Sequence, residues 1–226
     1  MSVRPSAGLV VSSAILVLLG CGGSRQAPTA APAPAAVPRA TPSGIAKARA
    51  DSARLPYTAA DIHFMSGMIH HHAQALVMAG WAKSHGASDA VLRLTGRILN
   101  AQRDEIHLMQ QWLVDRHQPA PVPNPRGMTM TMGGSEHVMP MPGMLTDDQM
   151  AELDRARGQE FDILFLKFMI QHHKGATAMV KELFATDGAG QDEIVFKFAS
   201  DVNVDQTTEI ARMEQMLVQL LFERGS

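Results

Sequence analysis

The sequence predicts an all-α fold, a four-helix bundle made of two duplicated helical hairpins with a long Met-rich linker between the halves. Composition favours helices over a β-sandwich, because aromatic residues make up only 5% of the chain while methionine reaches 16 residues. Two segments of the chain occur twice, each with the spacing of one face of an α-helix. The length of 226 residues suits one domain with extensions.

The first 21 residues are predicted to be a lipoprotein signal peptide rather than part of the fold. Arg4 supplies a basic start, and the apolar run from Gly8 to Leu19 is too short to span a bilayer. The run ends in Leu-Leu-Gly-Cys21, which resembles the bacterial lipobox, whose cysteine is lipidated. An ordinary cleaved signal peptide is the alternative. Because Cys21 is the only cysteine, the mature protein would contain no free thiol and no disulfide.

Residues 22–50 are predicted to form an Ala/Pro-rich tether. Prolines every few residues disfavour a helix and favour extended polyproline II, which acts as a semi-rigid spacer. We therefore expect the domain, residues 51–226, to lie outside the cytoplasm. The N-terminal lipid at Cys21 would anchor it to a bacterial membrane, at the periplasmic face or the cell surface.

Four long helices are expected in the domain, each bounded by capping and stop residues. Thr58, Ser88 and Thr146 offer N-caps, and Gly86 offers a C-terminal stop. Gly158 is a point where the third helix would break or bend. The expected helices span residues 58–85, 88–116, 146–186 and 191–222, with the linker at 118–145.

The stretch Phe64–Met78 recurs about a hundred residues later as Phe165–Met179. The matched positions follow Phe-x3-Met-x2-His-x3-Ala-x2-Met, which places them on one stripe of a helix. The second and fourth helices share Gln-x3-Ile-x2-Met-x3-Leu, beginning at Gln102 and Gln206. The duplicated unit is therefore a whole hairpin, and two hairpins that cannot bury their apolar stripes alone should pack together about an approximate twofold axis.

Imidazoles and thioethers on these stripes predict a metal site. His71 and His172 should face inward, whereas His72 and His173 should flank the stripe, because adjacent residues lie about 100° apart on a helix. Imidazole suits copper, zinc, iron or nickel, and thioether selects soft ions, above all Cu(I). The candidate ligands in the bundle are His71, His72, Met68, Met78, His172, His173, Met169 and Met179.

A structural interpretation of the same residues stays open. The first hairpin turn should place His71 level with Gln102 and Met68 level with Glu105, to within one helical turn. A buried imidazole could then be an ordinary core residue, hydrogen-bonded to such a glutamine. Methionines on a helix stripe are also commonly core filler.

The linker provides a second set of soft ligands. It contains Met-x-Met-x-Met and His-x-Met-x-Met among Gly and Pro, without apolar periodicity. Exposed thioethers contribute little stability and are liable to oxidation, whereas a flexible chain of them can wrap Cu(I) or Ag(I). A loop that simply tolerates methionine is the alternative. The weaker candidate ligands are Met128, Met130, Met132, His137, Met139, Met141 and Met144.

Charge and motifs argue against other classes of function. A formal net charge of -2 gives no basic face for a nucleic acid. A di-iron centre needs Glu-x-x-His on two helices, and covalent haem needs Cys-x-x-Cys-His; the sequence contains neither arrangement. It also lacks a Ser/His/Asp or phosphate-loop pattern. We therefore expect a protein that is not an enzyme.

With these residues, the sequence resembles the bacterial family called domain of unknown function 305. The resemblance covers about residues 55–222 and implies a ferritin-like four-helix bundle without di-iron ligands. Some members resemble a periplasmic copper-binding protein of cyanobacteria, so copper binding or resistance is implied. His70, which makes a triple His, stands where the second half has Gln171. The matching residues are Asp61-x-x-Phe64, Met68-Ile69-x-His71-His72, Ala75 and Met78, with Asp162-x-x-Phe165, Met169-Ile170-x-His172-His173, Ala176 and Met179.

Together these observations predict an extracytoplasmic protein that sequesters copper or hands it over in copper tolerance. Cu(I) is favoured, with Cu(II), Ag(I) and zinc as alternatives. The expected partners are the metal ion, the membrane through the lipid anchor, and a copper-handling protein. Two alternatives stay open: a non-catalytic interaction module whose His doublets are structural, and a haem or copper redox protein.

Overall fold

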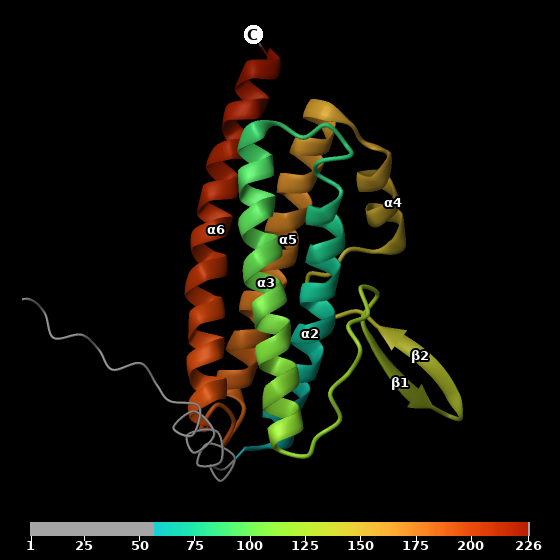
Figure 1. Cartoon of the computed structure of the whole chain (residues 1–226), viewed down its shortest axis with the longest axis vertical. Helices are drawn as coiled ribbons and strands as arrows, with labels where there is room; N and C mark the ends of the chain where they lie inside the picture. The colour runs from blue at the N-terminus through green and yellow to red at the C-terminus, as the bar shows by residue number, and fades with distance from the viewer. Residues whose placement is uncertain (1–56, 226) are drawn as a thin grey trace, which may run out of the picture. The chain divides into compact units, whose positions relative to one another are not determined.

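The computed structural model describes residues 57–225, which form five helices and one small sheet (Figure 1). The predicted signal peptide with Cys21, the tether and residues 51–56 lie outside the described residues. Within the described part, no helix is both long and apolar enough to cross a membrane. The elements are α2 (Ala59–Gly80), α3 (Asp89–Asp115), β1 (Met128–Met132), β2 (Ser135–Met139), α4 (Asp147–Arg155), α5 (Gly158–Ala185) and α6 (Glu193–Gly225).

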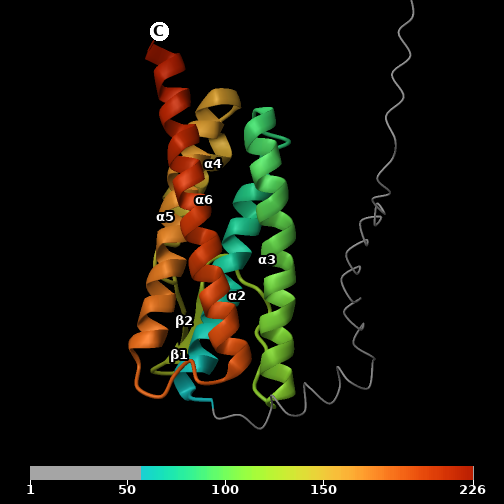
Figure 2. The ribbon, with the colours of Figure 1, turned by 90° about the vertical axis from the view of Figure 1, so that its left-hand side faces the viewer.

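The four long helices pack as two antiparallel hairpins, which confirms the predicted helical bundle. α2 lies against α3, and α5 lies against α6 (Figure 2). The two hairpins meet mainly where α2 contacts α5. The helices that carry the repeated Phe-Met-His-Ala-Met stripe therefore face each other at the centre of the bundle.

The helix starts follow the predicted caps. The Thr58 side chain accepts the Asp61 N–H in a capping box, and the Ser88 side chain caps α3 by accepting the Val91 N–H. The third predicted helix is broken rather than continuous: α4 ends at Arg155, and α5 begins at Gly158, whose φ is +57°. Glycine has no Cβ and adopts that left-handed conformation readily, so the break lies at the predicted residue.

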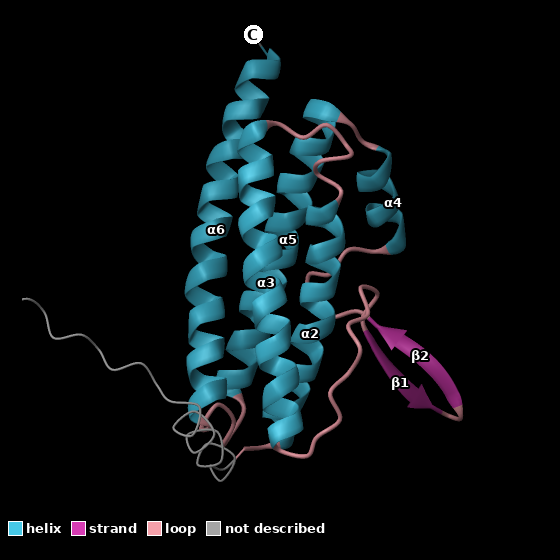
Figure 3. Ribbon diagram, viewed as in Figure 1, coloured by secondary structure: helices cyan, strands magenta, loops and turns pink. Residues whose placement is uncertain are grey.

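The linker differs from the prediction, because part of it forms a β-hairpin. β1 and β2 pair antiparallel, with Met128 opposite Met139 and Met132 opposite Ser135. Gly133 and Gly134 connect the strands with φ values of +59° and +82°, as a type I′ turn requires. The hairpin stands beside the bundle (Figure 3). The fold is thus a helical bundle with a small two-stranded sheet in its linker.

The apolar core is divided into two clusters, and the histidines lie between them. Along α2, buried apolar residues at 64–69 belong to the first cluster and those at 75–79 to the second. Along α5, which runs the other way, residues 161–170 belong to the second cluster and residues 176–183 to the first. His70–His72 of α2 and His172–His173 of α5 fall in the gap. A polar layer therefore crosses the middle of the bundle and is covered by apolar side chains at both ends.

Two buried aspartates fasten the hairpins to each other. An Asp61 carboxylate oxygen accepts the Gly190 N–H, in the turn between α5 and α6, at 2.7 Å. The repeat-related Asp162 accepts the Ser88 N–H, at the start of α3, at 3.2 Å. Each hairpin thus binds the turn of the other, so these two motif residues position the helices.

Candidate metal centre

Four imidazoles meet in the polar layer. His71, His72, His172 and His173 are each 0% exposed. The rings of His71 and His172 are in contact across the twofold axis, with their centroids 3.7 Å apart and their planes tilted by 37°. Within each doublet the ring centroids are 6.3 and 6.2 Å apart. His71 and His172 lie inward as expected, but His72 and His173 are equally buried rather than at the edge, because each has a carboxylate partner.

The outer imidazole of each doublet is bonded to a glutamate of the neighbouring helix. His72 Nε2 lies 2.6 Å from Glu105 Oε2, and His173 Nε2 lies 2.7 Å from Glu209 Oε2. The carboxylate side chains are 22% and 25% exposed, so this side of the layer reaches the surface between α3 and α6. The hairpin geometry had placed Glu105 level with Met68; the structure pairs it with His72, one turn further along α2.

The inner imidazoles are bonded to backbone carbonyls. His172 Nε2 lies 2.9 Å from the His71 carbonyl oxygen, and His71 Nε2 lies 3.1 Å from the carbonyl oxygen of Pro142 in the linker. A carbonyl can only accept a hydrogen bond, so Nε2 carries the proton in both rings. Burial, and then the neighbouring imidazoles, hold the pKa of His71 and of His172 well below the usual value. Both rings are therefore neutral at pH 7, with a lone pair at Nδ1.

Every Nδ1 atom of these four histidines is buried without a hydrogen-bond partner among the described residues. A histidine that binds metal through one ring nitrogen commonly donates the other N–H to a carboxylate or a backbone carbonyl. All four imidazoles show that pattern: Nε2 is bonded to oxygen, and Nδ1 is unpaired. The residues present thus fit a metal ion, which would find its nitrogen donors in these unpaired Nδ1 atoms.

Two glutamine side chains in the layer also have a buried atom without a hydrogen-bond partner. The Oε1 atoms of Gln102 and Gln206 are buried and unpaired, and neither glutamine is bonded to a histidine. The imidazoles take their hydrogen-bond partners from backbone carbonyls and glutamate carboxylates instead of from these glutamines. Leaving a buried acceptor unpaired costs about 1–3 kcal/mol. Within residues 57–225, no three His, Cys or carboxylate groups converge as a ready-made cation site.

The four methionines predicted as bundle ligands all lie in the core. Met68 and Met169 are 0% exposed and belong to different apolar clusters, one on each side of the imidazole layer. Met78 is fully buried in the second cluster, and Met179 is 6% exposed at the edge of the first. Each fills core volume, and its role as a ligand stays a prediction.

The weaker candidates of the linker separate into two groups. Met130, His137 and Met139 are exposed on the β-hairpin, and Met132 belongs to the same strand as Met130. Met128, Met141 and Met144 lie against the bundle instead. Met144 is buried, and its sulfur accepts the Met141 N–H at 3.1 Å. The linker thus does not act as one uniform chain of exposed thioethers.

Residues 140–145, here called the strap, cross the imidazole layer on the α2–α5 side. The backbone of Pro142 and Gly143 passes so close to α5 that a Cβ on Gly175 would lie 2.6 Å from the Gly143 Cα. The Gln74 side chain of α2 makes two hydrogen bonds to the end of the strap. It accepts the Leu145 N–H at 2.6 Å and donates to the Leu145 carbonyl at 3.1 Å. The strap was not predicted from the sequence. The only sign of it in the sequence is a glycine in each of the two segments that cross, Gly143 and Gly175.

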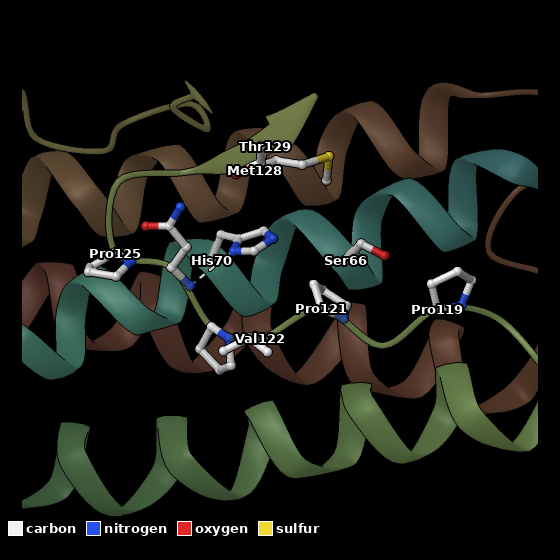
Figure 4. Close-up of a pocket in the computed structure, with 10 residues that line it drawn as sticks. Ser66, His70, Pro119, Pro121, Val122, Pro125, Met128 and Thr129 are labelled. Atoms are coloured by element: carbon white, nitrogen blue, oxygen red, sulfur yellow. Dashed lines mark hydrogen bonds between the residues drawn. The ribbon is translucent and has the colours of Figure 1, made fainter. Parts of the chain in front are cut away.

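The first histidine of the triple belongs to a different environment. His70 Nδ1 accepts the Asn124 N–H at 3.1 Å, and burial lowers the pKa of His70. The ring lies in a pocket of about 570 Å³ between α2 and the proline-rich part of the linker (Figure 4). His70 therefore binds the linker and lies outside the cluster of four imidazoles. The pocket is lined by Ser66, His70, Pro119, Pro121, Val122, Pro123, Asn124, Pro125, Met128 and Thr129.

Comparisons with known proteins agree with this architecture. The family model "Domain of unknown function (DUF305)" matches residues 61–217. A DUF305 fragment from Deinococcus radiodurans is 27% identical with a TM-score of 0.60, covering 73% of this chain and 99% of that chain. A candidate secreted DUF305 protein from Streptomyces coelicolor is 28% identical with a TM-score of 0.59, covering 71% and 93%. No curated protein shows a significant match.

The copper-bound structures of one further protein are also similar. CopM in its Cu(I)-bound form is 25% identical to this chain with a TM-score of 0.53, and the match covers 73% of this chain and 98% of that chain. CopM in its Cu(II)-bound form is 26% identical with a TM-score of 0.54, covering 70% and 96%. The same helical arrangement therefore occurs in a protein solved with copper.

Proposed function

This chain belongs to the DUF305 family, and on that premise we propose that it binds copper, above all Cu(I), in the four-imidazole layer. The observation that carries the proposal is the set of four buried, unpaired Nδ1 atoms. CopM, a structural relative solved with Cu(I) and with Cu(II), supports a metal ion as the ligand.

The inner pair, His71 and His172, would hold the ion. Their rings come from different hairpins and touch at the centre of the layer, and each Nε2–H is fixed by a carbonyl. Glu105 and Glu209 would orient His72 and His173 as additional nitrogen donors. Because burial keeps the inner rings neutral, an incoming ion displaces no proton from them.

The chemistry of the layer favours a soft monovalent ion. Zinc and Cu(II) take four ligands in ordered arrangements, whereas only one pair of imidazoles in the layer, His71 and His172, is in ring contact. A singly charged ion also loses less hydration energy when it enters a buried layer. Met68 and Met169, in the clusters above and below the layer, remain candidate thioether ligands.

The cellular role that we propose is sequestration or handover of copper outside the cytoplasm, without catalysis. The sequence motif at Cys21 supports a lipid anchor in a bacterial membrane, and the Streptomyces coelicolor relative supports an extracytoplasmic location. A copper-handling protein would be the partner that delivers or receives the ion. Silver binding is expected as well, because Ag(I) shares the ligand preference of Cu(I).

The alternatives are less well supported by the geometry. A haem between two axial ligands needs a gap the thickness of a porphyrin, whereas the His71 and His172 rings are 3.7 Å apart and packed between apolar clusters. A purely structural role for the doublets would leave four imidazole nitrogens and two amide oxygens buried without partners. An interaction module remains the second candidate, since it needs no metal.

Anaerobic titration of the full chain with Cu(I), in competition with a chromophoric chelator, tests the proposal. The double variant His71→Ala/His172→Ala should lose one tightly bound Cu(I), whereas His107→Ala, an exposed histidine of α3, should keep it. An unchanged stoichiometry for both Cu(I) and Cu(II) in the double variant would overturn the bundle site. A wild-type protein that binds no copper while the double variant only melts earlier would favour the interaction module.

A further inference from the structure

An outer stripe of α2 carries an unusual combination of residues. His63, Gly67 and His70 follow the 4-3 spacing of one helix face. The corresponding positions on α5 hold Leu164, Phe168 and Gln171, so this stripe is not part of the duplicated pattern. The first half of the bundle therefore has two imidazoles on this face with a residue that has no side chain between them, and the second half does not.

Three methionine side chains approach that glycine, one through its sulfur and two through their methyl groups. A Cβ placed on Gly67 would lie 2.9 Å from Met141 Sδ, 3.4 Å from Met179 Cε and 3.8 Å from Met128 Cε. These side chains come from the strap, from α5 and from the start of β1 respectively. The folded linker thus brings together methionines that are distant in the sequence, at a point where the helix has no side chain of its own.

Imidazoles and small cavities adjoin the thioethers on both sides. Met141 and Met179 line a cavity of about 80 Å³ together with His63 and Glu182. Met128 lines the larger pocket that contains His70 (Figure 4). The glycine at position 67 leaves room for Met141, so the strap brings a thioether onto the helix face that carries His63 and His70.

We propose that Met128, Met141 and Met179 form a second binding site for a soft monovalent cation, centred over Gly67, with His63 and His70 at its rim. Thioethers bind Cu(I) or Ag(I) in preference to harder ions, and the uncharged ligands suit a single positive charge. The site lies one helical turn before His71 on α2, and Pro142, next to Met141, bonds the His71 ring. The choice of ion rests on the proposed function, but the ligands are distinct from those of the imidazole layer.

The remaining linker methionines are excluded from this site by their positions. Met144 uses its sulfur to accept the Met141 N–H and so fixes the strap. Met130 and Met139 are exposed on the β-hairpin, at 41% and 44%. We therefore expect only Met128, Met141 and Met179, among the 16 methionines of the chain, to bind the cation at this site.

Titration of the full chain with Ag(I), followed by NMR of protein labelled with ¹³C at the methionine methyl groups, tests the inference. The methyl signals of Met128, Met141 and Met179 should shift together with one equivalent of Ag(I), while those of Met130 and Met139 stay in place. The variant Met141→Leu/Met179→Leu should lose one equivalent, and Met130→Leu should lose none. Gly67→Ala, which occupies the centre of the site and favours the helix, should weaken Ag(I) binding without unfolding the protein.

The possible results separate the two sites. If the three methyl signals stay in place, or if Met130 and Met139 shift in their stead, the inference is wrong, whatever happens in the imidazole layer. If the three signals shift in His71→Ala/His172→Ala as in wild type, the thioether site stands even where the imidazole site fails. Should the leucine variant fold poorly, the wild-type methyl shifts and the Gly67→Ala titration still decide.

Discussion

The two hairpins of this bundle are equivalent at the imidazole layer and different on the face beside it. His72–Glu105 and His173–Glu209 repeat the same contact at 2.6 and 2.7 Å. On the neighbouring face, Gly67 and Gln74 of α2 stand opposite Phe168 and Gly175 of α5 in the repeat. The duplication has therefore kept the residues that face inward and has changed those that face the linker.

The contacts of the strap explain this difference. Gln74 holds the strap at Leu145, Gly67 leaves room for Met141, and Gly175 lets the backbone of Pro142 and Gly143 pass. A single linker cannot follow the twofold symmetry of the bundle, so it contacts different residues in the two halves. The same asymmetry reaches the core, because His71 is bonded to Pro142 while His172 is bonded to the other hairpin.

The largest expected effect is a loss of stability in acid that both halves share. The inner imidazoles are neutral when folded because burial lowers their pKa, whereas the unfolded chain takes up protons near pH 6.5. Below that pH the unfolded state binds more protons, so folding weakens as pH falls. For each ring that stays neutral, the free energy of unfolding falls by at most about 1.4 kcal/mol per pH unit below pH 6.5.

Urea denaturation of the metal-free protein at several pH values measures this dependence. His71→Ala and His172→Ala should each remove about half of the slope of the unfolding free energy against pH, since the two rings are buried alike. A slope unaffected by both substitutions would place the acid sensitivity elsewhere. A slope lost with only one of them would show that the halves already differ in the core.

Gly175→Ala should disrupt the packing of the strap on α5, on the face where the two halves differ. The new methyl group would meet the backbone of Pro142 and Gly143, which cannot move aside as a flexible side chain would. Displacing the strap should cost about 1–3 kcal/mol, the usual range for overpacking. Gly96→Ala, at an open position in α3, is the matched control and should instead stabilise the helix by about 0.5–1 kcal/mol. Equal effects of the two substitutions on the denaturation midpoint would contradict a tightly packed strap.

Glu105→Gln and Glu209→Gln should test the symmetric layer. The amide oxygen can still accept from the imidazole, but the bond loses its charge, so each substitution should cost about 1 kcal/mol. Each should also weaken Cu(I) binding by about 10–100-fold, because the carboxylates orient the ligands. Chelator competition measures the affinities. Markedly different losses for the two variants would mean that the ion is held by one hairpin rather than on the axis.

The smallest effect is expected on the β-hairpin. Met130→Leu and Met139→Leu change exposed side chains, so stability should stay within about 0.5 kcal/mol of wild type. Copper stoichiometry in the bundle should not change either. A lost equivalent of Cu(I) in these variants would restore the expectation that the exposed linker binds metal by itself.

The bundle could be predicted from the sequence because its determinants are local and repeated. Thr58 and Ser88 cap their helices as short-range chemistry requires, and the spacing of Phe64, Met68 and His71 defines one helix face. Burial of His71 followed from that face. The burial of His72 did not, because it depends on a partner, Glu105, from another helix.

The linker was harder to predict, although part of its structure has a local pattern. Thr129 and Thr131 alternate with methionines before Gly133-Gly134, which is a hairpin pattern that the abundance of methionine obscured. The strap has no such pattern. Its position depends on contacts with Gln74 and Gly175, which are distant in the sequence and depend on how the two hairpins are placed.

The ring contact between His71 and His172 has a consequence for the lifetime of the protein. An ion held there would be bound by both hairpins at once, and so would link the two hairpins to each other. A ligand at a hundred times its Kd adds about 2.7 kcal/mol to the stability of the folded state. Because proteases attack the open form, the copper-loaded protein would survive longer than the empty one. The amount of protein would then rise with the supply of the ion that it holds.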